Sequence, residues 1–583
     1  MQNKKITPRL SALALAVAGA LAAQNAQALS FDLSNEATLD WDTTIAYTAA
    51  WRMSGQNSDL IDGSSNINFD DGNRNFKKGA MINNRLSVLT EMDLRYRDMG
   101  FFARGSAFYD DAYFGENDND SQATVNSLSA PAGRFTDGTK DTNGKDARLL
   151  DAFIYGNFEI GERNLSVRVG QQVVQWGEGL FLPGISSGQG PANGTKANIP
   201  GVEVKDIYLP VGQIYAEFDI TDNLSIGAYS QWEWKKTEID GSGAYFSTAD
   251  MLDEGGEMMN LLDLQQAGAT QAAINGLNAN KANVVNGAYF QATGGPAPAN
   301  VLAALPNANN PNPTRGKDIS PSDSGQWGVA FNYFAENIGE GVDFGLYYLN
   351  YHEKEPKIIE FYNIGGYDAF DDIGNPLVDG ALNNPLLVAN FAQLPSNYRL
   401  NYFENIKLIG ASFSTNIGET NIAGEIHQKK GATVISSNNG LAVRADTMQV
   451  QLSMLHSLGV TPIADNIMLT GEIGYNEVTN LDDDELMMEK SGSGMAGRVM
   501  FAYNNVFPAT NLEVPVSFRK NFEGHSAAGT FIPQRGDSLS VGANFTYKTS
   551  LQAGISYSAY FGSAEDNKLT DRDFVSLNLK YSF

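Results

Sequence analysis

The chain has 583 residues, no cysteine, 59 glycines and a formal net charge of −27. This acidic balance argues against nucleic acid as a partner. A long exported chain without disulfides needs another source of stability, and a closed sheet would supply it. After the N-terminal leader there is no run of about 18 apolar residues, which excludes membrane-spanning helices.

The first 28 residues have the composition of a secretory leader. Cations near the start precede an apolar stretch over 10–22, and small residues follow at 26–28. The apolar stretch is shorter than the roughly 20 residues of a spanning helix. We therefore predict a signal peptide over 1–28 that is cleaved before Leu29, with an uncleaved anchor as the alternative.

From residue 37 onward, segments that alternate apolar and polar residues recur along the chain. A period of two places one set of side chains on each face of a strand. A soluble sandwich alternates as well. We predict about eighteen strands, with fourteen or sixteen as alternatives, near 37–53, 83–98, 100–111, 148–159, 164–177, 207–220, 223–238, 325–337, 341–353, 401–416, 419–432, 444–458, 466–479, 494–507, 511–524, 537–549, 550–562 and 572–583.

The connections between these strands alternate in length, which favours a membrane barrel over a sandwich. Tight turns such as 161–163 alternate with long segments such as 54–82, 112–147 and 178–206. Outer-membrane barrels have short periplasmic turns and long extracellular loops. The sequence thus predicts an all-β, antiparallel outer-membrane barrel over 29–583, with both termini facing the periplasm of a Gram-negative cell.

The stretch 251–315 is the least barrel-like part of the chain. Residues 257–285 carry apolar side chains at helical spacing, and a low-complexity segment rich in Gly, Pro, Ala and Asn follows. Two interpretations stay open. One is a helix that folds into the lumen or caps its mouth as a plug, and the other is a disordered external insertion.

The polar faces of the strands indicate which side chains line the lumen. Charges of both signs alternate there, as a closed or plugged interior requires, whereas in a wide wet channel they would simply be solvated. An inward Trp-Gly-Glu phrase stands at the upper end of one strand. The candidate channel-lining residues are Arg85, Glu91, Asp93, Arg95, Arg104, Asp110, Arg168, Gln172, Trp176, Glu178, Glu425, Glu472 and Arg498.

The last strand ends on the final residue of the chain. Its apolar positions alternate up to Tyr581 and Phe583. In lipid an open sheet edge leaves unpaired backbone groups, so the last strand must pair with the first. We predict that Tyr581 and Phe583 form part of an assembly signal read by the barrel-assembly machinery, and that deletion of Phe583 blocks insertion while secretion continues.

Several phrases resemble one protein family. They include LSVRVGQQVVQWGEGLFLP (165–183), IPGVEVKDIYLP (199–210) and the closing DRDFVSLNLKYSF. These are similar to the family catalogued as domain of unknown function thirteen-oh-two, over nearly the whole mature chain, with 251–315 as a departure. The resemblance implies a Gram-negative outer-membrane protein surrounded by lipid and lipopolysaccharide. It also implies a periplasmic lipid-carrier protein and an inner-membrane exporter as partners.

The sequence contains only weak matches to motifs for catalysis or metal binding. The match to G-x-S-x-G at 184–188 lies in a Gly/Ser-rich loop instead of a strand-to-helix elbow. The acidic clusters at 137–146 and 481–485 resemble solvated loop tips more than calcium sites. We expect no catalytic residues, metal or cofactor. The predicted function is an outer-membrane channel or transporter for a hydrophobic or amphipathic molecule, gated by inward-folded loops; a polar porin for organic acids and a structural or adhesion protein are the alternatives.

Overall fold

The computed structural model describes residues 29–62, 66–260, 295–296, 313–356, 359–363, 395–437, 442–529 and 536–583. The predicted signal peptide lies outside these residues, as does most of the predicted insertion 251–315. Within the described ranges, no helix has the length and apolar character needed to cross a bilayer.

An antiparallel sheet of 19 strands forms the body of the molecule. One of them, β1 (Leu29–Ser34), pairs with β2 alone, and the other 18 close into a barrel through the pairing of β2 with β22. The predicted class and strand number are confirmed. The barrel strands are β2 (Ala37–Arg52), β3 (Met81–Tyr96), β4 (Met99–Asp110), β5 (Lys145–Ile160), β6 (Arg163–Gln172), β7 (Val211–Thr221), β8 (Leu224–Gln231), β10 (Gln326–Ala335), β11 (Val342–Tyr351), β14 (Ile406–Ile417), β15 (Thr420–Ile435), β16 (Ala442–Ser457), β17 (Asn466–Val478), β18 (Ser491–Phe507), β19 (Thr510–Glu523), β20 (Asp537–Tyr547), β21 (Leu551–Phe561) and β22 (Phe574–Ser582).

The seam between the first and last barrel strands includes the terminal residue. The Phe583 N–H donates to the Thr43 carbonyl at 2.9 Å, and the Thr43 N–H donates to the Phe583 carbonyl at 2.7 Å. The remaining part of the same edge of β2 pairs with β1, beginning with Leu29 opposite Trp41. The sequence did not predict β1, which covers the part of β2 that β22 is too short to reach.

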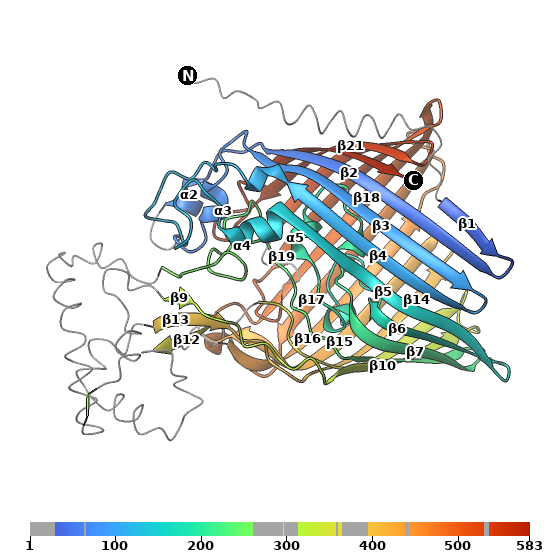
Figure 1. The fold of residues 1–583 in the computed structure, drawn as a ribbon. Coiled ribbons are helices and arrows are strands. Elements are labelled where there is room, and N and C mark those ends of the chain that lie inside the picture. The colour runs from blue at the N-terminus through green and yellow to red at the C-terminus, as the bar shows by residue number, and fades with distance from the viewer. Residues whose placement is uncertain are drawn as a thin grey trace.

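The long loops and the tight turns lie at opposite ends of the barrel (Figure 1). The short elements lie in the long connections, and three short strands form a small second sheet. These are α2 (Ser58–Ile61), α3 (Asp71–Arg74), η1 (Asp111–Tyr113), α4 (Asp137–Thr139), the π-helical η2 (Lys140–Gly144), η3 (Ile185–Gly188), α5 (Gly194–Ala197), η4 (Val204–Asp206), η5 (Asp483–Glu485), β9 (Thr314–Arg315), β12 (Ile359–Asn363) and β13 (Pro395–Leu400).

The outward face of the barrel is apolar, as the alternation predicted. Outward side chains on successive strands are exposed, and a soluble protein would seldom expose so many together. They include Leu346, Ile409, Ile426, Val450, Ile473 and Leu577. This belt is the surface that a membrane barrel presents to lipid.

Three local predictions are wrong. The strand predicted over 223–238 ends at Gln231. The strand predicted over 164–177 ends at Gln172, because the chain bends into the lumen there. The helix predicted over 257–285 does not begin at 257, because Met258 forms a β-bridge with Thr314 and the Arg315 N–H donates to the Glu257 carbonyl at 2.8 Å. The remainder of that helix lies outside the described residues.

Candidate functional site

The loop between β6 and β7, residues 173–210, crosses the interior of the barrel, and we call it the inner loop. It includes η3 and α5. Its backbone is bonded to side chains of β15, β16 and β17, strands on the other side of the lumen from β6 and β7. The loop that was predicted over 178–206 is therefore longer than predicted, and it enters the lumen.

Two carboxylates from the barrel wall hold the inner loop by its backbone. Glu472 of β17 accepts hydrogen bonds from the N–H groups of Leu180 at 3.2 Å, Phe181 at 2.6 Å and Leu182 at 2.8 Å. Glu425 of β15 accepts from the N–H groups of Glu178 and Ile185, both at 2.8 Å. Both carboxylates are buried. Charged acceptors of this kind form the stronger class of hydrogen bond.

Neighbouring side chains complete this anchor. The Gln449 amide donates to the Pro183 carbonyl at 2.7 Å, and the Gln451 amide donates to Glu472 at 3.0 Å. Lys429 donates to the Ser187 hydroxyl at 3.1 Å. Each of these residues comes from β15, β16 or β17, so one patch of wall binds one turn of the loop.

Glycines allow the loop to come this close to the wall. A Cβ atom at Gly184 would overlap the Glu425 carboxylate, and one at Gly177 would lie 2.6 Å from Glu425 Oε2. Gly177 also has a φ of +96°, a conformation that side chains disfavour. The loop therefore needs glycine at positions 177 and 184, because its backbone lies in contact with Glu425.

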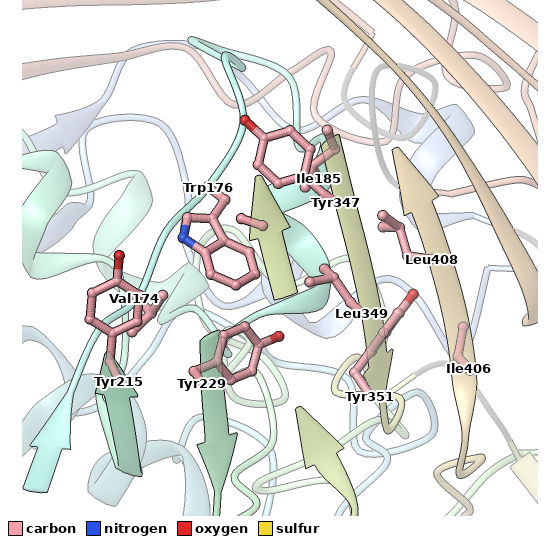
Figure 2. Close-up of a cluster of buried hydrophobic side chains, with 11 residues drawn as sticks. Val174, Trp176, Ile185, Tyr215, Tyr229, Tyr347, Leu349, Tyr351, Ile406 and Leu408 are labelled. Atoms are coloured by element: carbon pink, nitrogen blue, oxygen red, sulfur yellow. The ribbon is translucent and has the colours of Figure 1, made fainter. Parts of the chain in front are cut away.

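An apolar cluster lies where the loop leaves β6. Trp176 packs against Tyr229, Tyr347 and Tyr215, with ring centroids 5.1, 6.1 and 6.5 Å away (Figure 2). Its ring rests on Gly328, where a Cβ would lie 2.9 Å from the indole. The cluster consists of Val174, Trp176, Ile185, Tyr215, Tyr229, Ala330, Tyr347, Leu349, Tyr351, Ile406 and Leu408. Trp176 is therefore inward, as predicted, and it forms part of a core that fills one side of the lumen.

The returning half of the loop contacts the other wall. Lys205 is 3.1 Å from Glu91 of β3, and Asp206 is 3.8 Å from Arg104 of β4. Arg104 also pairs with Asp151 of β5 at 2.6 Å. Glu203 pairs with Lys580 of β22. Both walls thus hold the loop in place.

Further predicted residues near β3 form pairs of their own. The Arg85 guanidinium lies 3.4 Å from the centre of the Phe108 ring, and Asp110 accepts from the Asn83 amide at 2.9 Å. Asp93 accepts from the Tyr155 hydroxyl at 2.7 Å and lies 3.5 Å from Arg95, which also pairs with Asp40. These residues do not contact the Glu425 and Glu472 anchor.

The last three predicted residues are spread over other strands. Arg168 of β6 stacks on Tyr215 at 4.7 Å, and the buried Gln172 amide donates to the Gln213 carbonyl at 3.1 Å. Arg498 of β18 donates to the Ser517 hydroxyl at 3.0 Å and is exposed.

Burial alters two titratable groups outside the strands. The Lys354 ammonium donates to the Gly188 carbonyl of the inner loop at 3.2 Å, and burial lowers its pKa to about 7. Burial also raises the pKa of Glu178, and the charge of Asp343 adds to this rise. Among the described residues no group of three or more His, Asp or Glu side chains is arranged to hold a metal ion.

A cavity of about 600 Å³ lies between the inner loop and the other loops at the loop end of the barrel. Its charged lining residues within the described ranges are Asp240, Glu355 and Arg519. The large apolar side chains that line it are Leu180, Phe181, Leu182, Ile207, Ile239, Phe246, Leu252, Val434, Ile435, Met488 and Leu569. This composition suits a molecule with a substantial apolar part.

Residues 9–583 match the model of the family DUF1302, described as a protein of unknown function. The chain belongs to this family. The resemblance predicted from the sequence is confirmed, although the family description assigns no cargo.

Solved structures with a similar fold include OccAB3 of Acinetobacter baumannii and OccK5 (OpdH) of Pseudomonas aeruginosa. Each shares 9% identity with a TM-score of 0.38, over 94% of this chain and 99% or 97% of theirs. The outer membrane channel DcaP of Acinetobacter baumannii shares 9% identity with a TM-score of 0.34, over 95% and 99%. At these values they say nothing about the cargo of this chain. No curated protein matches the sequence.

Proposed function

We propose that the protein is an outer-membrane channel that passes a hydrophobic or amphipathic molecule, and that the inner loop is its gate. The observation that carries the proposal is the cavity of about 600 Å³, whose described lining is mainly apolar and which the inner loop bounds from Gly179 to Pro183. Apolar lining with a few polar groups is typical of sites that bind molecules with large apolar surfaces.

The geometry of the inner loop supports a gate. Its backbone blocks part of the lumen, while two carboxylates and a few amides hold it there. The polar contacts that hold the turn over 178–187 are hydrogen bonds to polar side chains of β15, β16 and β17, and release of this turn requires that these bonds be broken. Movement of the loop would join the cavity to the rest of the lumen.

Transport by proteoliposomes tests the proposal. We supply a fluorescent lysophospholipid on albumin and, separately, an isotonic dicarboxylate solution that causes swelling if it permeates. We expect transfer of the lysophospholipid that depends on the protein, with little swelling. Swelling without transfer would favour a polar porin for organic acids, and neither response would favour a structural or adhesion protein.

Variants of the cavity wall make the test specific. Phe181→Asp and Leu252→Asp place a charge in the cavity and should slow transfer by about tenfold, the effect of roughly 1.4 kcal/mol. Leu128→Asp is the matched control, because Leu128 is 55% exposed and outside the cavity lining. Equal transfer by all three variants would contradict the assignment of the cavity.

A further inference from the structure

Pro515 lies within β19, in the wall of the barrel. No other barrel strand, each of which is described along its whole length, contains a proline. Proline has no backbone N–H to donate, so in sheets it is found at edges or bulges. β19 is not an edge, because it pairs with β18 on one side and β20 on the other, and its irregularities against β18 lie away from Pro515, which stands opposite Met500.

The ladder between β19 and β20 is interrupted at this proline. Pairing runs from Thr510 opposite Tyr547 to Glu513 opposite Asn544, and resumes in the same register at Val516 opposite Val541. The positions between are Val514 and Pro515, which stand opposite Ala543 and Gly542. The Gly542 carbonyl receives no hydrogen bond from Pro515. In lipid each unpaired backbone group costs several kcal/mol, so barrels keep such groups paired.

On the β20, β21 and β22 side of this gap the lumen face carries only small side chains, whereas on the β18 side Met500 and Arg498 share the face of Pro515. Val541, Ile555 and Leu577 are exposed on the lipid face, which turns the residues beside them toward the lumen. The residues that face the lumen around the gap are Ser540, Gly542, Ser556, Ser558 and Ser576, and the serines bond to one another in two pairs. A Cβ at Gly542 would lie 3.3 Å from Pro515 Cγ, so the proline ring is in contact with a bare backbone.

The gap lies on the side of the lumen that the cavity reaches. Arg519 at the loop end of β19 lines the cavity together with Leu180 and Phe181 of the inner loop. The anchor of the inner loop, in contrast, is on β15 and β17. The cavity also touches Thr433, Val434 and Ile435 of β15, so a molecule in it lies between the wall that anchors the loop and the wall with the interrupted ladder.

We propose that the cargo passes sideways between the lumen and the lipid of the outer membrane, through the β19–β20 seam at Pro515 and Gly542. The inference rests on the proposed function, since an apolar or amphipathic cargo is the kind that partitions into lipid. Two strand positions span about 7 Å, which suits an extended hydrocarbon chain. The seam opens here because fewer hydrogen bonds have to be broken than elsewhere along β19 and β20.

A reversible crosslink across the seam tests this route. The chain has no cysteine, so Val514→Cys with Ala543→Cys gives a single disulfide between residues that face each other across the gap. The control pair is Ile555→Cys with Leu577→Cys, which joins β21 to β22 at the level of Ala543. Both proteins are assayed in proteoliposomes with the fluorescent lysophospholipid, oxidised and after reduction.

We expect oxidation to slow transfer into lipid by about tenfold or more in the seam pair and by less than about twofold in the control pair, because only the first bond bridges the gap. Reduction should restore the rate. As a second variant, Pro515→Thr returns an N–H to the ladder and should slow transfer several-fold without a crosslink.

The outcomes separate this route from the function itself. Transfer that persists in the oxidised seam pair and in Pro515→Thr, at the rate of the unmodified protein, would overturn the lateral route and leave the channel intact. Absence of transfer by the unmodified protein would overturn the proposed function and this route with it.

Discussion

Two neighbouring parts of the barrel wall, which we call the filled half and the bare half, differ in what they hold, and β2–β7 form the rest of the wall. The filled half, β8, β10, β11 and β14–β17, carries the aromatic cluster around Trp176 and the carboxylates that bind the inner loop. The bare half, β18–β22, presents serines, glycines and the proline of β19 to the lumen, between longer side chains such as Arg498, Arg519 and Lys580. The filled half holds a buried aromatic core and the loop anchor, whereas the bare half contacts the inner loop through the pair of Lys580 with Glu203.

We expect the stability of the protein and the transport of its cargo to depend on different parts of the wall. Large buried rings and bonded carboxylates stabilise the filled half, because they bury apolar area and satisfy backbone groups. Small side chains in the bare half leave space and few contacts. We infer that variants of the filled half alter stability and the position of the loop, whereas variants of the bare half alter transport alone.

The largest effect is expected for Glu472→Ala. It leaves the N–H groups of Leu180, Phe181 and Leu182 without their acceptor, and each buried unsatisfied group costs about 1–3 kcal/mol. The inner loop should detach, so single-channel conductance in planar bilayers should rise several-fold.

Two further variants control this result. Glu472→Gln keeps one acceptor oxygen and should give an intermediate conductance. Glu419→Ala alters an exposed carboxylate in the tight turn between β14 and β15, away from the inner loop, and should leave conductance unchanged. Unchanged conductance in Glu472→Ala, with a folded barrel, would show that the loop does not obstruct the pore.

Trp176→Ala is expected to destabilise the protein by about 3–5 kcal/mol, the usual cost of removing a large buried side chain. The anchor at Glu425 and Glu472 stays, so conductance should change little. Urea unfolding in lipid vesicles measures the loss. Trp232→Ala, at a side chain that is 50% exposed, is the control and should have a much smaller effect.

Gly184→Ala should have a smaller effect, about 1–3 kcal/mol, because the loop can shift to relieve the overlap between the new Cβ and Glu425. Its conductance should rise, but less than in Glu472→Ala. Gly190→Ala is the control in the same loop, since the nearest atom to its Cβ would be the Leu209 carbonyl oxygen at 3.9 Å. Equal behaviour of the two variants would contradict a tight approach at Gly184.

The barrel could be predicted from the sequence because lipid imposes a period of two on every strand. The same parity placed Glu425 and Glu472 on the lumen face, whereas Trp176, which was predicted on a strand, lies on the inner loop beyond the end of β6. Parity could not show that the two glutamates bind the inner loop, because their partners are backbone N–H groups, which every residue type except proline carries.

Other features leave a pattern in the sequence whose meaning can be recognised only once the fold is known. Gly177 and Gly184 are visible in the sequence, but their need for close approach depends on a wall strand about 240 residues away in the chain. Pro515 lies in a segment that alternates normally, and its effect appears only when β20 is known to be its neighbour. The short β1 was missed because it has the length of a loop.

The smallest predicted effect is a pH dependence of the filled half. Burial lowers the pKa of Lys354 to about 7, while an unfolded lysine titrates near its ordinary value of about 10.4. Below pH 7 both states bind the proton, so this group adds no pH dependence. Between pH 7 and about 10 the unfolded state binds more protons, and the free energy of unfolding should rise with pH by up to about 1.4 kcal/mol per unit.

Urea unfolding at pH 6 and pH 8.5 checks this sign. Lys354→Met should remove the rise, because methionine keeps the apolar stem without the proton. Deprotonation also costs one of the donors that the ammonium offers to the Gly188 carbonyl and its other acceptors, Gln326 and the His352 carbonyl. The measured rise should therefore fall short of the full linkage value. A fall in stability over the same interval, absent from Lys354→Met, would mean that the hydrogen bonds to the inner loop outweigh the cost of burying the charge.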